Sequence, residues 1–249
     1  MTDNLLSDLL AIQSTVRDYF GWSYEADMTS ANEMSRLMSS THPYGVSTWS
    51  PENRVNSMNL LKKRLQSAEK VVIVGASVEK SEVANLGAED SVIIAADGSV
   101  GAVVGFANLT CVVTDFDGHP HLDKVADSGP YFIAHAHGDN HQQWKMSMSK
   151  WSKLSAPPRI ILTHQIAEQI VGMENFGGFT DGDRAVCLAI ALGVKVKDIT
   201  LIGFSTAKVG KWSGQTNPER KLEKLDWMLK VLEIIGLSDQ VTTRPSLEL

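Results

Sequence analysis

Two hydrophobic patterns divide the chain near residue 68. In residues 1–68 apolar side chains such as Leu5 and Leu9 recur at intervals of three and four, which is the period of an amphipathic helix. Ser50 followed by Pro51 supplies a helix N-cap and a first-turn proline. We therefore expect residues 1–68 to form a helical N-terminal cap or scaffold. Its aromatic residues could line a ligand pocket, but we interpret them as core, the commoner place for aromatic side chains of a helical segment: Trp22, Tyr24 and Trp49.

From residue 69 the pattern changes to short, continuous apolar runs that alternate with stretches of helical spacing. Continuous runs rich in Val and Ile are typical of strands buried on both faces of a parallel sheet. Parallel strands need crossover connections, which place helices on the faces of the sheet. The fold class predicted is α/β, a mostly parallel Rossmann-like sheet flanked by helices, with residues 69–249 as the catalytic domain. The expected strands cover residues 71–74, 92–95, 111–113, 131–134, 159–162 and 199–202.

Composition narrows the choice of partners. The 249 residues include 29 acidic and 23 basic side chains, a net charge of −6, which argues against a broad surface for nucleic acid or anionic membrane. The acidic N-terminus lacks the features of a signal peptide, and no apolar stretch approaches the roughly 20 residues that span a bilayer. Cys111 and Cys187 lie within apolar segments and are expected to be reduced core residues. We expect a cytoplasmic protein that acts on small molecules; homo-oligomerisation stays open.

The residues that follow the predicted strands are polar and rich in glycine. In open parallel sheets, ligands bind beyond the carboxyl ends of the strands, so these residues are site candidates. Asp115 and Asp117 follow one strand, while Asp97 and Asp139 follow its two neighbours. Carboxylates held together raise one another's pKa unless a cation neutralises them, and an Asp-x-Asp pair suits magnesium. The sequence therefore predicts a metal-dependent site at this edge of the sheet.

A second group of candidates lies in residues 175–184. Thr180 can N-cap a helix that extends to about residue 192, with Asp183 in its first turn. Capping does not account for Asp181 or for the two glycines, Gly177 and Gly178. Glycines before a helix N-terminus can make room for a ligand against backbone N–H groups. We interpret this segment as a binding site.

Lysines near the C-terminus are candidates for binding phosphate. The segment from Gly203 to Lys211 differs from a P-loop, because six residues separate its glycines and Trp212 follows the lysine. The lysines are therefore individual candidates: Lys208, Lys211 and Lys224.

Taken in order, these motifs resemble those of the archaeal-type 6-hydroxymethyl-7,8-dihydropterin pyrophosphokinases, and some elements also resemble thiamin pyrophosphokinases. The resemblance rests on Gly75-x-Ser77, Ala96-Asp97-Gly98, Thr114–Gly118, His135–Asn140 and Asn175–Arg184. It implies an enzyme that transfers diphosphate from Mg-ATP to the hydroxymethyl group of a reduced pterin and releases AMP. Such a reaction belongs to pterin- or folate-type cofactor biosynthesis, including that of tetrahydromethanopterin.

The resemblance also implies roles for individual residues, with Mg²⁺ as the cofactor and ATP as the co-substrate. The catalytic residues are Asp97, Asp115, Asp117 and Asp139, of which the last three hold the metal. The nucleotide-binding residues are Gly75, Ser77, Gly98, Asn140, Lys208, Lys211 and Lys224. The substrate-binding residues are Asn175, Phe176, Gly177, Gly178, Thr180 and Asp181.

Three alternatives compete with this hypothesis. The stretch His135–His141 differs by one inserted residue, Asn140, from the zinc signature of the metallo-β-lactamase superfamily, which suggests a zinc-dependent hydrolase. Asp115–Gly118 also resembles the nucleophile motif of haloacid-dehalogenase-type phosphatases, although those enzymes carry it on their first strand. A nucleotide sensor without turnover is the third alternative. Packing or hydrogen bonding is expected for the histidines that a magnesium site leaves without a role: His135, His137 and His141.

Overall fold

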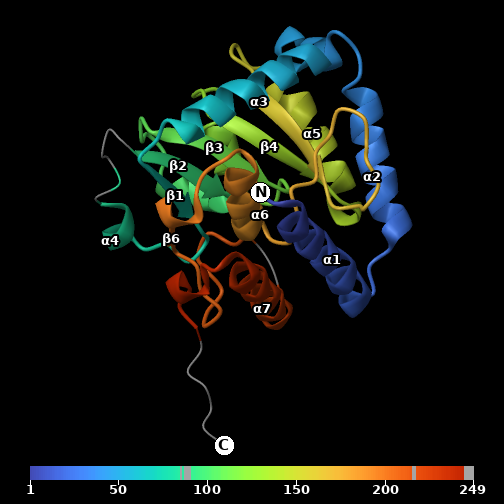
Figure 1. The fold of residues 1–249 in the computed structure, drawn as a ribbon. Helices are drawn as coiled ribbons and strands as arrows, with labels where there is room; N and C mark the ends of the chain where they lie inside the picture. The colour runs from blue at the N-terminus through green and yellow to red at the C-terminus, as the bar shows by residue number, and fades with distance from the viewer. Residues whose placement is uncertain (85, 87–90, 215–216, 244–249) are drawn as a thin grey trace, which may run out of the picture.

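The computed structural model describes residues 1–84, 86, 91–214 and 217–243. Its centre is a sheet of six strands in the order β5-β4-β3-β2-β1-β6, and all five pairings are parallel (Figure 1). This confirms the α/β class and each of the predicted strands. The strands are β1 (Lys70–Val74), β2 (Ser91–Ala96), β3 (Leu109–Thr114), β4 (Tyr131–Ala136), β5 (Arg159–His164) and β6 (Ile199–Ile202).

Alternate residues of each strand feed two separate hydrophobic clusters. Val71 and Ile73 belong to one cluster, and Val72 and Val74 belong to the other. Both faces of the sheet are therefore buried, which explains why the strands appear in the sequence as continuous apolar runs. Helices cover both faces (Figure 1). They are α1 (Asp3–Phe20), α2 (Tyr24–Leu37), α3 (Pro51–Gln66), α4 (Lys80–Val83), α5 (His141–Trp151), α6 (Asp181–Ala191) and α7 (Pro218–Ile235).

The N-terminal region is helical, as predicted, and it packs directly on the sheet. α1 ends at Gly21, whose φ of 65° turns the chain toward α2. Leu9 of α1 and Leu61 of α3 share a hydrophobic cluster with the strands. Trp49 is fully buried, as expected of a core residue. The division into two domains at residue 68 stays a prediction.

The connection from β5 to β6 creates the place where a ligand can bind. Strands β1 to β5 follow one another across the sheet, and the chain then returns to place β6 on the other side of β1. Such a reversal leaves a crevice beyond the carboxyl ends of the strands. α6, which belongs to this connection, contacts β1, β2 and β3.

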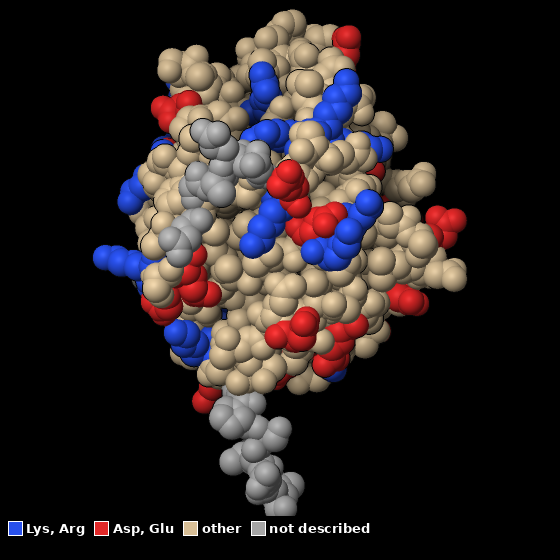
Figure 2. Space-filling model, turned by 60° about the vertical axis from the view of Figure 1, so that its left-hand side comes forward, with Lys and Arg blue, Asp and Glu red and all other residues tan. Residues whose placement is uncertain are grey.

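The surface carries both signs of charge. Figure 2 shows Lys and Arg side chains interspersed with Asp and Glu side chains on one face of the molecule. Within the described part of the chain, no helix has the length and hydrophobicity needed to cross a bilayer.

Candidate functional site

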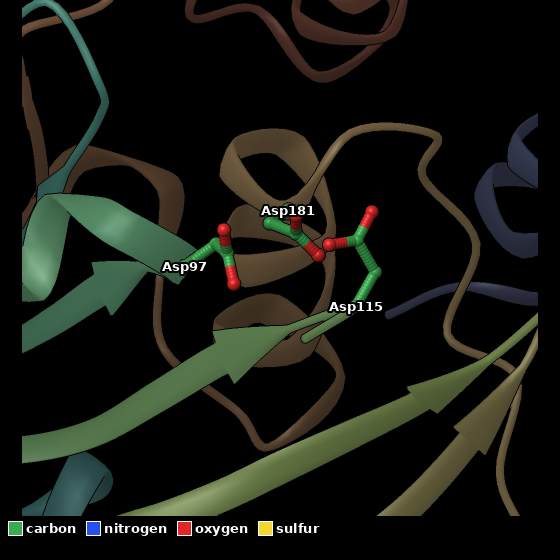
Figure 3. Close-up of side chains that lie close together, drawn as sticks. All are labelled: Asp97, Asp115 and Asp181. Atoms are coloured by element: carbon green, nitrogen blue, oxygen red, sulfur yellow. The ribbon is translucent and has the colours of Figure 1, made fainter. Parts of the chain in front are cut away.

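Three carboxylates from separate elements converge at the carboxyl edge of the sheet (Figure 3). Asp97 follows β2, Asp115 follows β3, and Asp181 is the first residue of α6. One oxygen from each side chain lies within 4.8 Å of the other two. Among the described residues, no other group of three His, Cys, Asp or Glu side chains is placed to hold a metal ion in this way.

The backbone at two of these strand ends adopts a conformation that most side chains avoid. Asp97 has φ of 46° and Phe116 has φ of 74°, both in the left-handed region. The Thr114 hydroxyl stabilises both turns, because it donates to Asp97 Oδ1 and accepts from the Phe116 N–H at 2.8 Å. Residues held in this region by their surroundings are concentrated at functional sites.

The carboxylates strongly affect one another's protonation. Burial and the nearby Asp115 charge raise the pKa of Asp97 to about 7 and that of Asp117 to about 6. The same two causes raise the pKa of Asp181 well above its usual value. Burial opposes ionisation of Asp115 as well, but His137, Arg184 and Lys221 outweigh it and hold the pKa of Asp115 below its usual range. A divalent cation would relieve this repulsion.

His137 supports the charged form of Asp115. Its Nδ1 accepts a hydrogen bond from the Asp139 N–H at 3.2 Å, which assigns the ring proton of the neutral form to Nε2. Nε2 lies 3.6 Å from Asp115 Oδ2. The sequence left the role of His137 open, and the structure gives this residue an electrostatic role beside Asp115.

Two cavities meet at the carboxylate group. The first lies at the carboxyl ends of β1 and β6, where Gly75 and Ser77 line it together with Asp97. The second lies between the α1–α2 connection and the loops that follow β3 and β4, and Asp115 lines it. The two cavities share Thr180, Asp181 and Lys221.

Close backbone packing forms the first cavity. A Cβ atom on Gly98 would lie 2.3 Å from Trp212 O, and one on Gly210 would lie 2.1 Å from Ala76 O. Trp212 N–H also donates to Ala76 O at 3.2 Å. Glycine is thus required where the loop after β6 closes over the loop after β1.

Aromatic and basic side chains form one wall of the second cavity. The rings of Trp22 and Phe179 have centroids 5.8 Å apart, and Lys224 Nζ lies 5.0 Å from the Trp22 ring centroid. Arg184 is buried and also lines this cavity. Trp22 is thus a cavity residue, although the sequence was interpreted as placing it in the core.

The structure places some of the predicted site residues in the cavities. In the first are Gly75, Ser77, Gly98 and Asp97; in the second are Asp115, Asp117, Asp139 and Lys224; Thr180 and Asp181 line both. Asp139 is exposed and lies outside the three-carboxylate group. Thr180 also caps α6 together with Asp183, as predicted.

Other predicted residues have contacts elsewhere. The Asn140 amide donates to the backbone oxygens of Asp115 and His135, at 2.9 and 2.7 Å. Lys208 and Lys211 form exposed ion pairs with Glu79. Asn140 therefore supports the loop that carries Asp115, and the two lysines lie outside both cavities.

The segment before α6 packs against the protein itself. Asn175 exchanges two hydrogen bonds with the Gln13 side chain, at 3.1 and 2.9 Å. A Cβ on Gly177 would lie 2.6 Å from Leu9 Cβ, and one on Gly178 would lie 2.9 Å from Arg184 Cα. These glycines make room for α1 and α6. Phe176 lines a separate small cavity next to Gly177.

The motifs behind the zinc and dehalogenase alternatives have other surroundings. His135 is buried against Thr163 and Gln165, while His141 pairs with Glu33 on α2. These two histidines therefore point to different partners and do not meet His137 at a metal site within the described residues. Asp115 follows the third strand, after β1 and β2, as the sequence predicted.

Several cavity residues have no signal in the sequence: Ser23, Ala26 and Asp27. Gln165 was a candidate only as one of the polar residues that follow a predicted strand. Lys221 carried a weak signal, because it lies one turn from Lys224 on the same helix face. Arg184 was included only as the end of the 175–184 motif.

Buried histidines give this protein a predictable acid sensitivity. Burial lowers the pKa of His164 to about 4 and that of His135 well below its ordinary value of 6.5. Below pH 6.5 the unfolded chain binds protons that the folded protein cannot, so stability falls as the pH drops toward 4. We expect His164→Asn to reduce this slope by about 1 kcal/mol per pH unit in urea unfolding between pH 6.5 and 4. The exposed His42→Asn is the control, and equal slopes for all three proteins would contradict the prediction.

Fold and site together define an α/β protein with a group of three carboxylates at the junction of two cavities. No family model matches the chain. A 6-hydroxymethyl-7,8-dihydropterin pyrophosphokinase of Pyrococcus furiosus is 35% identical over 189 residues, which cover 72% of this chain and 78% of the relative. Proteins of the same name from Methanothermobacter thermautotrophicus and Methanocaldococcus jannaschii are 36% and 32% identical, over 42% and 45% of this chain and 43% and 46% of their own. The chain belongs to the 6-hydroxymethyl-7,8-dihydropterin pyrophosphokinase family, a family of enzymes.

Proposed function

We propose that this protein transfers diphosphate from ATP to the hydroxymethyl group of 6-hydroxymethyl-7,8-dihydropterin and releases AMP, with Mg²⁺ as the metal. The supporting observation is the three-carboxylate group at the junction of two cavities in a chain of this family. A two-substrate transfer requires the reacting groups of both substrates to meet at one place. The product would enter pterin cofactor biosynthesis.

The donor set fits magnesium. Carboxylate oxygens are hard ligands, and magnesium sites combine them with waters and substrate phosphates. Asp97, Asp115 and Asp181 would hold the ion, which would neutralise charge on the triphosphate. Asp117, whose charge interacts with Asp115, lies beside this group. The proposal therefore gives Asp97 and Asp181 the part that the sequence-based hypothesis gave to Asp117 and Asp139.

The two cavities suit the two substrates. The first offers the N-terminus of α6, whose positive end favours phosphate, beside the loop Gly75–Ser77, in which the Gly75 and Ser77 N–H groups already donate to Ile202 O and Gly203 O. The second offers the rings of Trp22 and Phe179, which suit a flat heterocycle. We therefore place ATP in the first cavity and the pterin in the second.

In the transfer, the pterin hydroxyl oxygen bonds to the β-phosphorus while the bond from that phosphorus to the α–β bridging oxygen breaks. AMP departs with the bridging oxygen, and the hydroxyl loses one proton. Asp139, an exposed residue that lines the second cavity, would accept that proton. Lys221 lies between the cavities and would offset the negative charge that develops on the phosphates.

Nucleotide analysis of a reaction mixture tests this function. The protein is incubated with ATP, Mg²⁺ and 6-hydroxymethyl-7,8-dihydropterin, and AMP is expected in equal amount to the pterin diphosphate. ADP in place of AMP would indicate monophosphoryl transfer, and the absence of product would favour a nucleotide sensor. Thiamin in place of the pterin tests the substrate of the related thiamin pyrophosphokinases.

Metal removal gives a second prediction for this function. Excess EDTA should reduce AMP formation to background, because the phosphate charges and the three carboxylates would then face each other without a cation. Adding Mg²⁺ beyond the EDTA should restore the rate. Undiminished turnover in EDTA would refute the metal assignment, and restoration by zinc alone would revive the zinc alternative.

A further inference from the structure

Asp27 of α2 is a carboxylate of the second cavity with no part in the three-carboxylate group. Asp27 lines the cavity but is only 4% exposed. The other carboxylates of this cavity differ from it: Asp115 and Asp181 belong to the group, and Asp117 and Asp139 are exposed. A buried carboxylate is costly unless its partners fix it, so its surroundings indicate its role.

The hydrogen-bond partners of Asp27 hold its carboxylate in one orientation and leave one of its acceptor positions unused. Oδ2 accepts from Arg17 Nε at 3.1 Å and from Gln165 Nε2 at 2.9 Å. Oδ1 accepts from the Gly138 N–H at 2.8 Å. A carboxylate offers about four acceptor positions, so these three bonds leave one, on Oδ1.

Gln165 is fixed in the same way. Its Oε1 accepts from Arg184 Nη2 at 2.7 Å, and one hydrogen of its Nε2 is donated to Asp27. Within the described part of the chain the second Nε2 hydrogen has no such partner, and Gln165 lines the second cavity. The cavity therefore has an acceptor and a donor side by side on neighbouring rigid side chains.

This polar pair lines the same cavity as the rings of Trp22 and Phe179 and is linked to the carboxylate group. Arg184, which bonds Gln165, also reaches Asp181 with Nη1 at 3.3 Å. The indole N–H of Trp22, a residue of the same cavity, is buried and has no hydrogen-bond partner among the described residues. A flat ring with polar edges matches this combination better than an aliphatic alcohol does.

We infer that Asp27 is the specificity-determining residue that accepts a hydrogen bond from the 2-amino group of the pterin, while Gln165 donates to a neighbouring acceptor of the same ring. The inference rests on the proposed function. It differs from the sequence-based expectation that Asp181 and Asn175 bind the substrate, because Asp181 lies in the carboxylate group and Asn175 is bonded to Gln13. The N-terminal helices would thus select the acceptor substrate.

Two acceptors test this inference on the unmodified protein first. They are 6-hydroxymethyl-7,8-dihydropterin and its lumazine analogue, which carries oxygen in place of the 2-amino group. We expect kcat/KM for AMP formation to favour the pterin by about tenfold or more, because the analogue would present an acceptor to the carboxylate. Equal values for the two acceptors would overturn the inference. AMP formation from neither acceptor would instead refute the proposed function.

Variants then assign the preference to Asp27. Asp27→Asn retains the shape of the side chain and can donate to the analogue, so the ratio of the two kcat/KM values should fall to about one while KM for ATP stays unchanged. A purely structural role would lower Tm and leave the ratio as it was, which would overturn the inference. The control is Asp18→Asn, at an exposed position of α1 next to the Arg17 partner.

Arg17 requires a second variant, because Asp27→Asn leaves its guanidinium buried without a charged partner. Arg17→Met combined with Asp27→Asn removes both charges and should show the same loss of preference with a higher Tm than the single variant. Retention of the pterin preference in the double variant would exclude Asp27 as the selecting residue.

Discussion

Asp97→Asn is expected to abolish turnover and to stabilise the metal-free protein. The amide can still accept the Thr114 hydrogen bond, and asparagine tolerates the φ of 46° at this position. It removes a carboxylate whose pKa is raised from 3.8 to about 7 by burial and by Asp115. Because Asp97 is proposed to bind the metal, its loss as a ligand should lower kcat at least about a hundredfold.

The stability gain should depend on pH and on magnesium. A carboxyl group whose pKa is raised in the folded state destabilises the folded protein as the pH rises from 3.8 to about 7. The gain in folding stability from Asp97→Asn should therefore be absent below pH 4 and complete above pH 7. In EDTA at pH 8 it should reach about 3 kcal/mol in the free energy of unfolding, or several degrees in Tm. Mg²⁺ should reverse the order, because it stabilises the wild type more.

Thermal unfolding and AMP formation, measured on the same preparations, check both parts of this expectation. Asp8→Asn, at an exposed position of α1, is the control and should match the wild type in both measurements. A lower Tm for Asp97→Asn in EDTA would show that repulsion does not dominate at this site. Normal turnover would remove Asp97 from the metal group.

The sheet was predictable because burial on both faces imposes a simple pattern. Strands such as Val71–Val74 contribute alternate residues to two clusters, so no polar residue interrupts them. The carboxylate group was predictable in part for a related reason. Neighbouring parallel strands end at the same edge of the sheet, so the strand order alone brings Asp97 and Asp115 together. Asp181 reaches them only because α6 crosses β2 and β3, which is tertiary information.

The remaining differences come from packing that local sequence does not encode. Gly177 and Gly178 were interpreted as making room for a ligand, and in the structure the space that a Cβ atom would need at each is filled by Leu9 and Arg184. Asp27 has no motif around it, and it lines the cavity because α2 contacts the loop that contains Gly138. A glycine pair or an isolated acid has the same appearance in the sequence whether its neighbour is a ligand or a helix.

Lys221→Met is expected to lower kcat about a hundredfold or more, with a smaller change in KM for the pterin. Lys221 is the basic residue that the two cavities share, and its charge favours the ionised form of Asp115. A cation at the junction counts most when charge moves from one phosphate to the next, so the loss should appear mainly in kcat. AMP formation at saturating ATP and pterin measures it.

Lys211→Met separates this structural assignment from the sequence-based one. Lys211 followed the last strand and was a nucleotide-binding candidate, but in the structure it forms an exposed ion pair with Glu79. The exposed Lys230→Met, on the same helix as Lys221, controls for the loss of one positive charge. If kcat falls in Lys221→Met, and if Lys211→Met and Lys230→Met have equal kcat, the phosphates lie at the junction of the cavities. If Lys211→Met loses more activity than Lys221→Met, the triphosphate instead lies toward Glu79, and the placement of ATP proposed above is wrong.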